Sequence, residues 1–285
     1  MRTRPTSWWL AALRKRRERI AGEKLDLSEP PAFPSEEERA AAIAFFNAAY
    51  RAEESGLRQA HELAGEMGRT DPDLAECLRL YGDEEGWHRS LLEEFLAWLG
   101  GSVRPMGPTT RTFYRLYKRA ERMESIVLIN LMFETIGSTT YRIALRSARQ
   151  PAVRQMLTIL TRDESFHVPL NVHFLRAAIE QAPHARPHLR RLYHATFAAL
   201  VASTVASRRR ARRFDGIPTG VLARAYAEQL ARLFLEERDL AIEPSSLLLR
   251  AFGLDRDALL RAASPVDLAA AERSVDRESV VVEAL

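Results

Sequence analysis

Two short stretches of this sequence combine carboxylates with a histidine at the same spacing. Residues 83–88 (DEEGWH) and 163–167 (DESFH) each contain a Glu-x-x-His motif. Residues three positions apart lie on one face of an α-helix, so the Glu and the His of each motif can reach the same metal site. With 38 acidic residues and 7 histidines in 285 residues, about one acid-x-x-His is expected by chance. The motif is therefore informative only through its place in the fold.

Long helices must position these motifs, because the apolar periodicity is helical almost throughout the chain. Ser35 with Glu38 is typical of a capping box, and Pro72 suits the first position of a helix. A connector over residues 100–110 precedes a short helix and then a long one. The long helices are predicted over residues 36–67, 72–99, up to about 149, and 151–181. Shorter helices are expected over residues 6–21, 187–213, 218–238 and 244–262, followed by a weakly patterned tail after Pro265.

Two long helical hairpins joined by a connector predict an all-α, four-helix bundle with one long crossover. We expect three parts in the chain. They are an N-terminal amphipathic helix with a Pro-rich linker (1–34), the bundle (36–181), and a helical extension packed on it (187–285).

The acids lie at matching depths in the two predicted hairpins. Glu85 follows the turn near residue 69 by about sixteen residues, and Glu53 and Glu54 precede it by about as many. Glu164 follows the turn near residues 149–150 by about fifteen residues, and Glu134 precedes it by the same number. Because a helix rises uniformly, equal distances from a turn mean equal depth in an antiparallel hairpin. Each hairpin is therefore predicted to place a Glu opposite a Glu-x-x-His at mid-bundle.

The apolar neighbours of these acids predict that their side chains point inward, where uncompensated carboxylates would be strongly unfavourable. Two divalent metal ions would balance four such charges, and oxygen and imidazole ligands suit iron or manganese. On the first long helix, Glu53 shares a face with Gly56 and apolar residues, whereas Glu54 lies nearer Arg51 and Arg58. We favour Glu53 as the ligand and keep Glu54 as the alternative.

Residues 36–181 resemble the ferritin-like di-iron carboxylate superfamily in this arrangement of Glu and Glu-x-x-His. The resemblance implies that Glu85 and Glu164 bridge two metal ions. It implies terminal ligands at Glu53 (or Glu54) and Glu134, and one histidine for each metal ion, His88 and His167. It also implies that the acids preceding the motifs orient these imidazoles, Asp163 toward His88 and Glu84 toward His167.

The activity implied by the resemblance is that of a non-haem di-iron oxygenase or oxidase. Such an enzyme would use O₂ to hydroxylate, N-oxygenate, desaturate or cleave a small organic substrate, with iron, or manganese in one or both positions. Ser138 follows Glu134 by four residues, where oxygenases of this superfamily often carry a hydroxyl. With the small residues Gly137, Thr139 and Thr140 it predicts a catalytic cavity, or alternatively close helix packing.

Electrons would come from a separate reductase or ferredoxin, or from the substrate itself, because the single cysteine, Cys77, excludes a redox pair and an iron–sulfur cluster held by this chain alone. Tyr81 and Tyr141 lie on the predicted metal-facing stripe, where we expect packed core residues rather than a proton relay. No apolar run is long enough to span a membrane. We expect a cytoplasmic protein that does not bind nucleic acid, either monomeric or a homodimer.

Other functions remain open from the sequence. A ferroxidase or peroxide-scavenging protein would use the same metal ligands without an organic substrate. A hydroxylase acting on modified tRNA, and a bundle that only binds metal, are further alternatives.

Overall fold

The two helices of the first hairpin begin at side chains that cap them. The computed structural model describes residues 4–105 and 122–261. Helix α2 (Glu36–Met67) follows Ser35, whose hydroxyl accepts a hydrogen bond from the Glu38 N–H at 3.1 Å. Helix α3 (Pro72–Trp98) follows Asp71, whose carboxylate accepts from the Leu74 N–H at 3.0 Å. These contacts satisfy N–H groups that a helix leaves unpaired in its first turn, so the helices begin where the sequence predicts.

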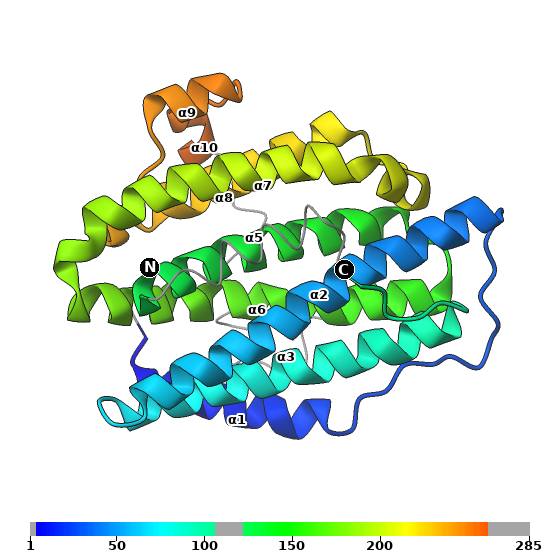
Figure 1. The fold of residues 1–285 in the computed structure, drawn as a ribbon, viewed down its shortest axis with the longest axis horizontal. Coiled ribbons are helices and arrows are strands. Elements are labelled where there is room, and N and C mark those ends of the chain that lie inside the picture. The colour runs from blue at the N-terminus through cyan, green and yellow to red at the C-terminus, as the bar shows by residue number, and fades with distance from the viewer. Residues whose placement is uncertain (1–3, 106–121, 262–285) are drawn as a thin grey trace.

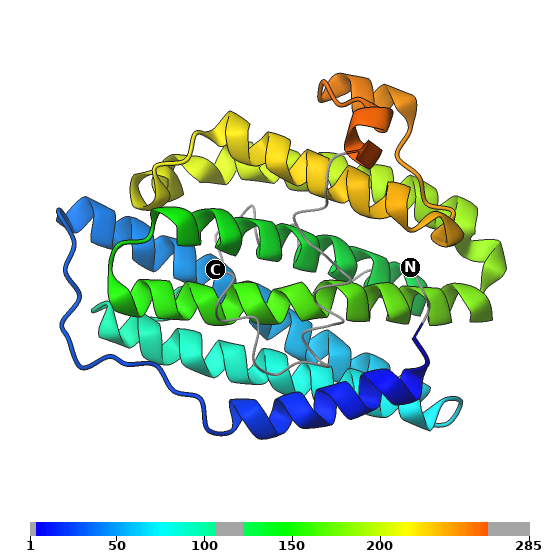
Figure 2. The ribbon, with the colours of Figure 1, turned by 180° about the vertical axis from the view of Figure 1, so that it is seen from behind.

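A second hairpin completes the bundle. Helices α5 (Met123–Ser147) and α6 (Pro151–Gln181) pack together as α2 and α3 do, and the four helices lie side by side in Figures 1 and 2. The all-α fold and the bundle with one long crossover are thereby confirmed, and the described residues contain no β-strand. The short helix predicted after the connector lies outside the described residues.

Helix α1 (Thr6–Ile20) packs on the outside of the bundle against α3, as the two lower helices of Figure 2 show. Its apolar stripe is buried at Trp9, Leu13 and Ile20. Trp9 also contacts Phe166 of α6, with ring centroids 5.6 Å apart. The N-terminal helix therefore lies over both helices that carry a Glu-x-x-His motif.

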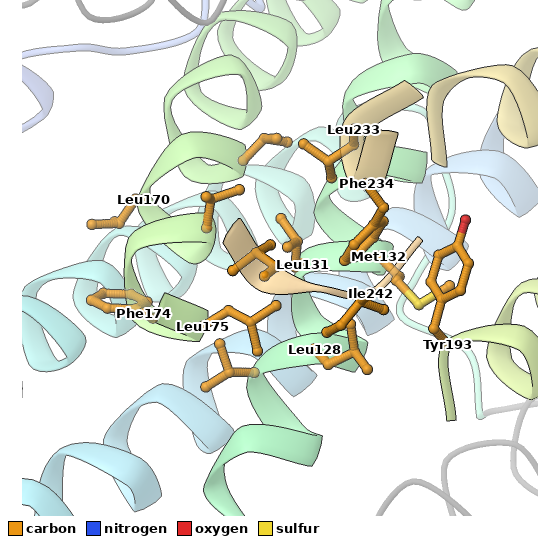
Figure 3. Close-up of a cluster of buried hydrophobic side chains, with 14 of the residues drawn as sticks. Leu128, Leu131, Met132, Leu170, Phe174, Leu175, Tyr193, Leu233, Phe234 and Ile242 are labelled. Carbon is orange, nitrogen blue, oxygen red and sulfur yellow. The ribbon is translucent and has the colours of Figure 1, made fainter. Parts of the chain in front are cut away.

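Helices α7 (Arg186–Asp215) and α8 (Thr219–Glu236) form a further layer over α5, and α7 also contacts α2 (Figure 1). A short 3-10 helix (Pro183–Ala185) leads into α7, and Gly216 ends α7 with a φ of 69°. Apolar side chains from α5 and α6 meet those of the outer layer in Figure 3. The residues labelled there are Leu128, Leu131, Met132, Leu170, Phe174, Leu175, Tyr193, Leu233, Phe234 and Ile242.

The predicted helix over 244–262 is wrong, because the structure divides it. A second 3-10 helix (Arg238–Leu240) is followed by α9 (Ser246–Ala251) and α10 (Arg256–Arg261). Gly253 separates them with a φ of 62°, a left-handed conformation that favours glycine, and Asp255 then caps the next turn through the Ala258 N–H at 2.7 Å. The tail after Pro265 lies outside the described residues.

Candidate metal centre

Six acidic and imidazole side chains from four helices meet in the middle of the bundle. Every one of them is buried, and the two histidines are fully so. They are Glu53 on α2, Glu85 and His88 on α3, Glu134 on α5, and Glu164 and His167 on α6. The structure thus brings together residues separated by more than a hundred positions in the sequence.

The ligand atoms of these side chains form three overlapping groups, and within each group they lie within 4.8 Å of one another. The groups are Glu53, His88 and Glu164; Glu134, Glu164 and His167; and Glu85, His88 and His167. Glu53 and Glu134, here called the outer glutamates, belong to different groups, and each group contains a different histidine. Glu164 belongs to both of these groups. Glu85 belongs to the group that contains both histidines. The geometry therefore offers two neighbouring positions for an ion, with two carboxylates between them.

Both histidines present the same ring nitrogen to the carboxylates. Nδ1 of His88 lies 3.4 Å from Oε2 of Glu53, and Nδ1 of His167 lies 2.9 Å from Oε1 of Glu85. The Nε2 atoms point away from the cluster. An imidazole can donate a proton from Nε2 and keep the lone pair of Nδ1 free for a metal ion.

The donor atoms test whether a metal fits here. Oε1 of Glu85, Oε2 of Glu164 and both ring nitrogens of His167 are buried without a hydrogen-bond partner among the described residues. Buried polar atoms are normally paired, so an unpaired group of acceptors and imidazole nitrogens needs an explanation. Carboxylate oxygens and neutral imidazoles are ligands for divalent transition metals, which would satisfy these atoms.

The pKa shifts in the metal-free protein also indicate a site that fits positive ions. Burial raises the pKa values of Glu85 and Glu164 well above the ordinary range, and neighbouring carboxylates raise them further. Burial opposes a charge on His88, but hydrogen bonds to Asp163 and Glu53 raise its pKa to about 10. Glu85, Glu164 and His88 are therefore protonated at neutral pH in the metal-free protein. A bound metal ion would replace the positive charge of these protons.

The acids that precede the motifs, Asp163 and Glu84, lie behind the two imidazoles. Oδ2 of Asp163 is hydrogen-bonded to Nε2 of His88 at 3.3 Å, and Oε2 of Glu84 faces Nε2 of His167 at 3.7 Å. Asp163 is completely buried and Glu84 nearly so. Each acid thus lies beside the outward nitrogen of one histidine, and Asp163 is hydrogen-bonded to it.

Sequence reasoning missed the arginine that lies between these two acids. Arg16 of α1 is buried, and its guanidinium contacts Glu84 and also Asp163, the latter at 2.9 Å. Burial raises the pKa of Glu84, but the charge of Arg16 together with the neighbouring His167 lowers it to about 2. The signal was available, because position 16 continues the buried stripe formed by Trp9, Leu13 and Ile20.

Two predicted site residues lie outside the cluster. Glu54 is half-buried and pairs with Arg51 at 2.6 Å, so of the two neighbours only Glu53 points into the bundle. Ser138 is fully buried, but its hydroxyl accepts a hydrogen bond from Arg142 at 2.9 Å and it does not line the cavity described below.

Two tyrosines donate to the outer glutamates. The Tyr81 hydroxyl donates to Oε1 of Glu134 at 2.5 Å, and the Tyr141 hydroxyl donates to Oε1 of Glu53 at 3.3 Å. Both rings are buried in the core, as expected, and both also contact the candidate metal centre. Burial raises the pKa of each tyrosine well above its ordinary value, so the hydroxyls remain protonated donors.

A cavity of about 40 Å³ borders the carboxylates. Its lining includes four of the clustered glutamates, two glycines and Phe133. Gly56 lies three residues after Glu53 and Gly137 three residues after Glu134, and both glycines line the cavity together with the small residues Ala52 and Ser55. Both glycines are half-buried, as are Ala52 and Phe133, so the wall that α2 and α5 contribute to the cavity is partly exposed.

A comparison with solved structures finds a chain of similar fold. It is a protein with aldehyde deformylating oxidase activity from Synechococcus, 20% identical, with a TM-score of 0.63. The alignment covers 81% of this chain and 100% of that protein. No protein-family model and no curated protein matches the sequence. At this identity the likeness establishes a shared helical fold and leaves the chemistry to be argued from the site.

None of the described helices is both long and apolar enough to cross a membrane.

Proposed function

We propose that this chain is an O₂-dependent di-iron oxidase or oxygenase that acts on a small organic substrate. The observation that carries the proposal is the cavity beside two overlapping ligand groups that share Glu164. A metal pair with protein ligands on one side and free space on the other can accept a further ligand. A metal site that is only structural would instead be closed by protein ligands.

In this proposal Glu85 and Glu164 would hold both ions, and Glu53 and Glu134 would each hold one. His88 and His167 each bind one ion through Nδ1. Iron is the proposed metal, with manganese as the alternative in one or both positions. When bound, the iron pair would supply the reduction of O₂ and the oxidising equivalents for the substrate.

Side chains of this protein would line the reaction space and fix the positions of the ligands. Phe133, Ala52 and the glycines would exclude water from the space beside the carboxylates, while Tyr81 and Tyr141 hold the outer glutamates in place. Gly137, rather than Ser138, is the small residue of α5 on the cavity wall, so we now assign the substrate-facing position to Gly137.

The size of the cavity limits what reaches the metals. About 40 Å³ accommodates roughly three water molecules, which suits dioxygen or the narrow end of an aliphatic substrate. An aliphatic aldehyde is a substrate class to test first, because the similar structure is named for activity on aldehydes. With one cysteine, Cys77, in the chain, a separate reductase or ferredoxin would deliver the electrons.

Metal analysis combined with a single-turnover reaction tests the proposal. The iron-loaded protein should contain two ions per chain, and after reduction it should consume O₂ and oxidise an added aliphatic aldehyde. A reproducible value well below one ion per chain would overturn the metal centre.

The small cavity also favours a second candidate, a ferroxidase or peroxide-scavenging protein without an organic substrate. The same experiment separates the two. Rapid oxidation of added ferrous iron into a mineral, with no organic product from a panel of aldehydes, amines and alkanes, would favour iron handling.

A further inference from the structure

The two acids behind the histidines are not supported equally. Asp163 contacts three arginines: Arg16 at 2.9 Å, Arg19 at 2.8 Å and Arg162 at 2.8 Å. Glu84 contacts one arginine among the described residues, Arg16, through both Nε and a terminal nitrogen. Loss of Arg16 would therefore leave Asp163 with two arginine partners and Glu84 with no arginine partner among the described residues.

The position of Arg16 is set by packing as well as by charge. Its guanidinium lies over the ring of Phe166, 4.1 Å from the centroid. Phe166 is the residue directly before His167. Trp9 contacts the same phenylalanine ring from α1. A planar guanidinium can stack on an aromatic ring while its nitrogens reach two carboxylates, which an ammonium group cannot do.

From this geometry we infer that Arg16 is a positioning residue that holds Glu84 behind His167, so that α1 supports one of the two metal positions more than the other. The inference rests on the proposed metal centre. Glu84 is the acid that faces Nε2 of His167, at 3.7 Å, and orienting that ring directs Nδ1 toward the carboxylates. The position that includes His88 is expected to depend less on Arg16, because Asp163 keeps Arg19 and Arg162.

Cobalt(II) titration of the full chain tests the inference, with visible absorption to follow each ion and a competing chelator to measure affinity. Arg16→Gln should leave one ion at wild-type affinity and weaken the other by roughly 10–100-fold, the usual effect of removing a partner behind a metal ligand. Arg19→Gln is the matched control. Arg19 lies on the same helix as Arg16 and contacts Asp163 but not Glu84. Both metal affinities should therefore be unchanged in this variant.

A double-mutant cycle distinguishes positioning through Glu84 from a general loss of α1 packing. Glu84→Gln should weaken the same ion, and the double variant should lose little more than either single variant, because the two residues act through one contact. Arg16→Lys, which keeps the charge, should give an intermediate loss and serves as the test if Arg16→Gln does not fold.

Equal weakening of both ions in Arg16→Gln, or a variant indistinguishable from Arg19→Gln, would overturn the role of Arg16. Additive losses in the double variant would do the same. These results differ from failure of the proposed function, in which the wild-type chain itself would not bind two ions.

Discussion

Gly56 of α2 lies against the carboxylate of Glu85 on α3. A Cβ atom at position 56 would come within 2.9 Å of Oε2 of Glu85, closer than Cβ atoms approach other atoms in proteins. Because Gly56 has no side chain, the Glu85 carboxylate can occupy its position in the ligand group that it shares with both histidines. This contact shows how the backbone of one helix sets the position of a candidate metal ligand on the next.

Gly56→Ala should accordingly weaken metal binding. The added methyl group must displace Glu85, and such overpacking costs about 1–3 kcal/mol, or very roughly 5- to 150-fold in affinity if the cost falls on the metal-bound state. Gly65→Ala on the same helix is the control, because its Cβ would meet nothing within 4 Å. Chelator competition measures both variants. Equal affinities in the two would show that Glu85 moves aside without effect.

Metal binding should release protons. Without metal, burial and neighbouring carboxylates raise the pKa values of Glu85 and Glu164, and the pKa of His88 is about 10. These groups hold protons at neutral pH that a metal ion must displace, so affinity should rise as the pH rises. Calorimetry in two buffers with different ionisation enthalpies measures the release. Identical apparent enthalpies in the two buffers would contradict it.

Tyr81→Phe should destabilise the metal-free protein. The hydroxyl donates at 2.5 Å to the buried carboxylate of Glu134, and a hydrogen bond to a charged group contributes about 1.5–3 kcal/mol. Tyr141→Phe removes a longer bond, 3.3 Å to Glu53, and should cost less. Urea unfolding followed by circular dichroism compares the two. A larger loss of stability in Tyr141→Phe than in Tyr81→Phe would contradict this prediction.

Gly137→Val should impair oxidation of an organic substrate while leaving metal binding intact. A Cβ at this position meets only Tyr141, at 3.7 Å, so a side chain can enter the cavity without striking a glutamate. Ser138→Ala is the neighbouring control, because Ser138 does not line the cavity. Product formed per iron pair is the measurement. Full turnover in Gly137→Val would place the substrate elsewhere.

Acidification should destabilise the protein through His173. Burial, with help from Arg176, lowers the pKa of this imidazole to about 4, against 6.5 for an unperturbed histidine, while Asp71 opposes the shift. The unfolded chain therefore binds the proton more readily, so stability is lost as the pH falls from about 6.5 to about 4. Full loss corresponds to about 3 kcal/mol at most.

His173→Gln, which cannot titrate, should lose less stability over the same pH interval. Urea unfolding of the metal-free protein at pH 7 and pH 4 gives the comparison. The same pH dependence in both proteins would assign the acid sensitivity to other groups.

Much of this protein follows from local properties of the sequence. Ser35 and Asp71 set the starts of α2 and α3 through hydrogen bonds that span three residues. The depth of Glu85 and Glu164 follows from the uniform rise of a helix and the position of each turn. These are short-range relationships, so the bundle and the level of the acidic residues in it could be predicted. The division at Gly253 was missed, because one residue with a positive φ decides it.

The tertiary structure decided which of two neighbouring side chains reaches the centre. Adjacent residues on a helix point about 100° apart, so the rotation of α2 or α5 about its axis decides between Glu53 and Glu54, or between Gly137 and Ser138. That rotation depends on packing against other helices, to which a periodic pattern is only a coarse guide. The sequence pattern could place Arg16 on the buried face of α1, but its contact with Glu84 depends on α1 docking against a helix 68 residues away along the chain.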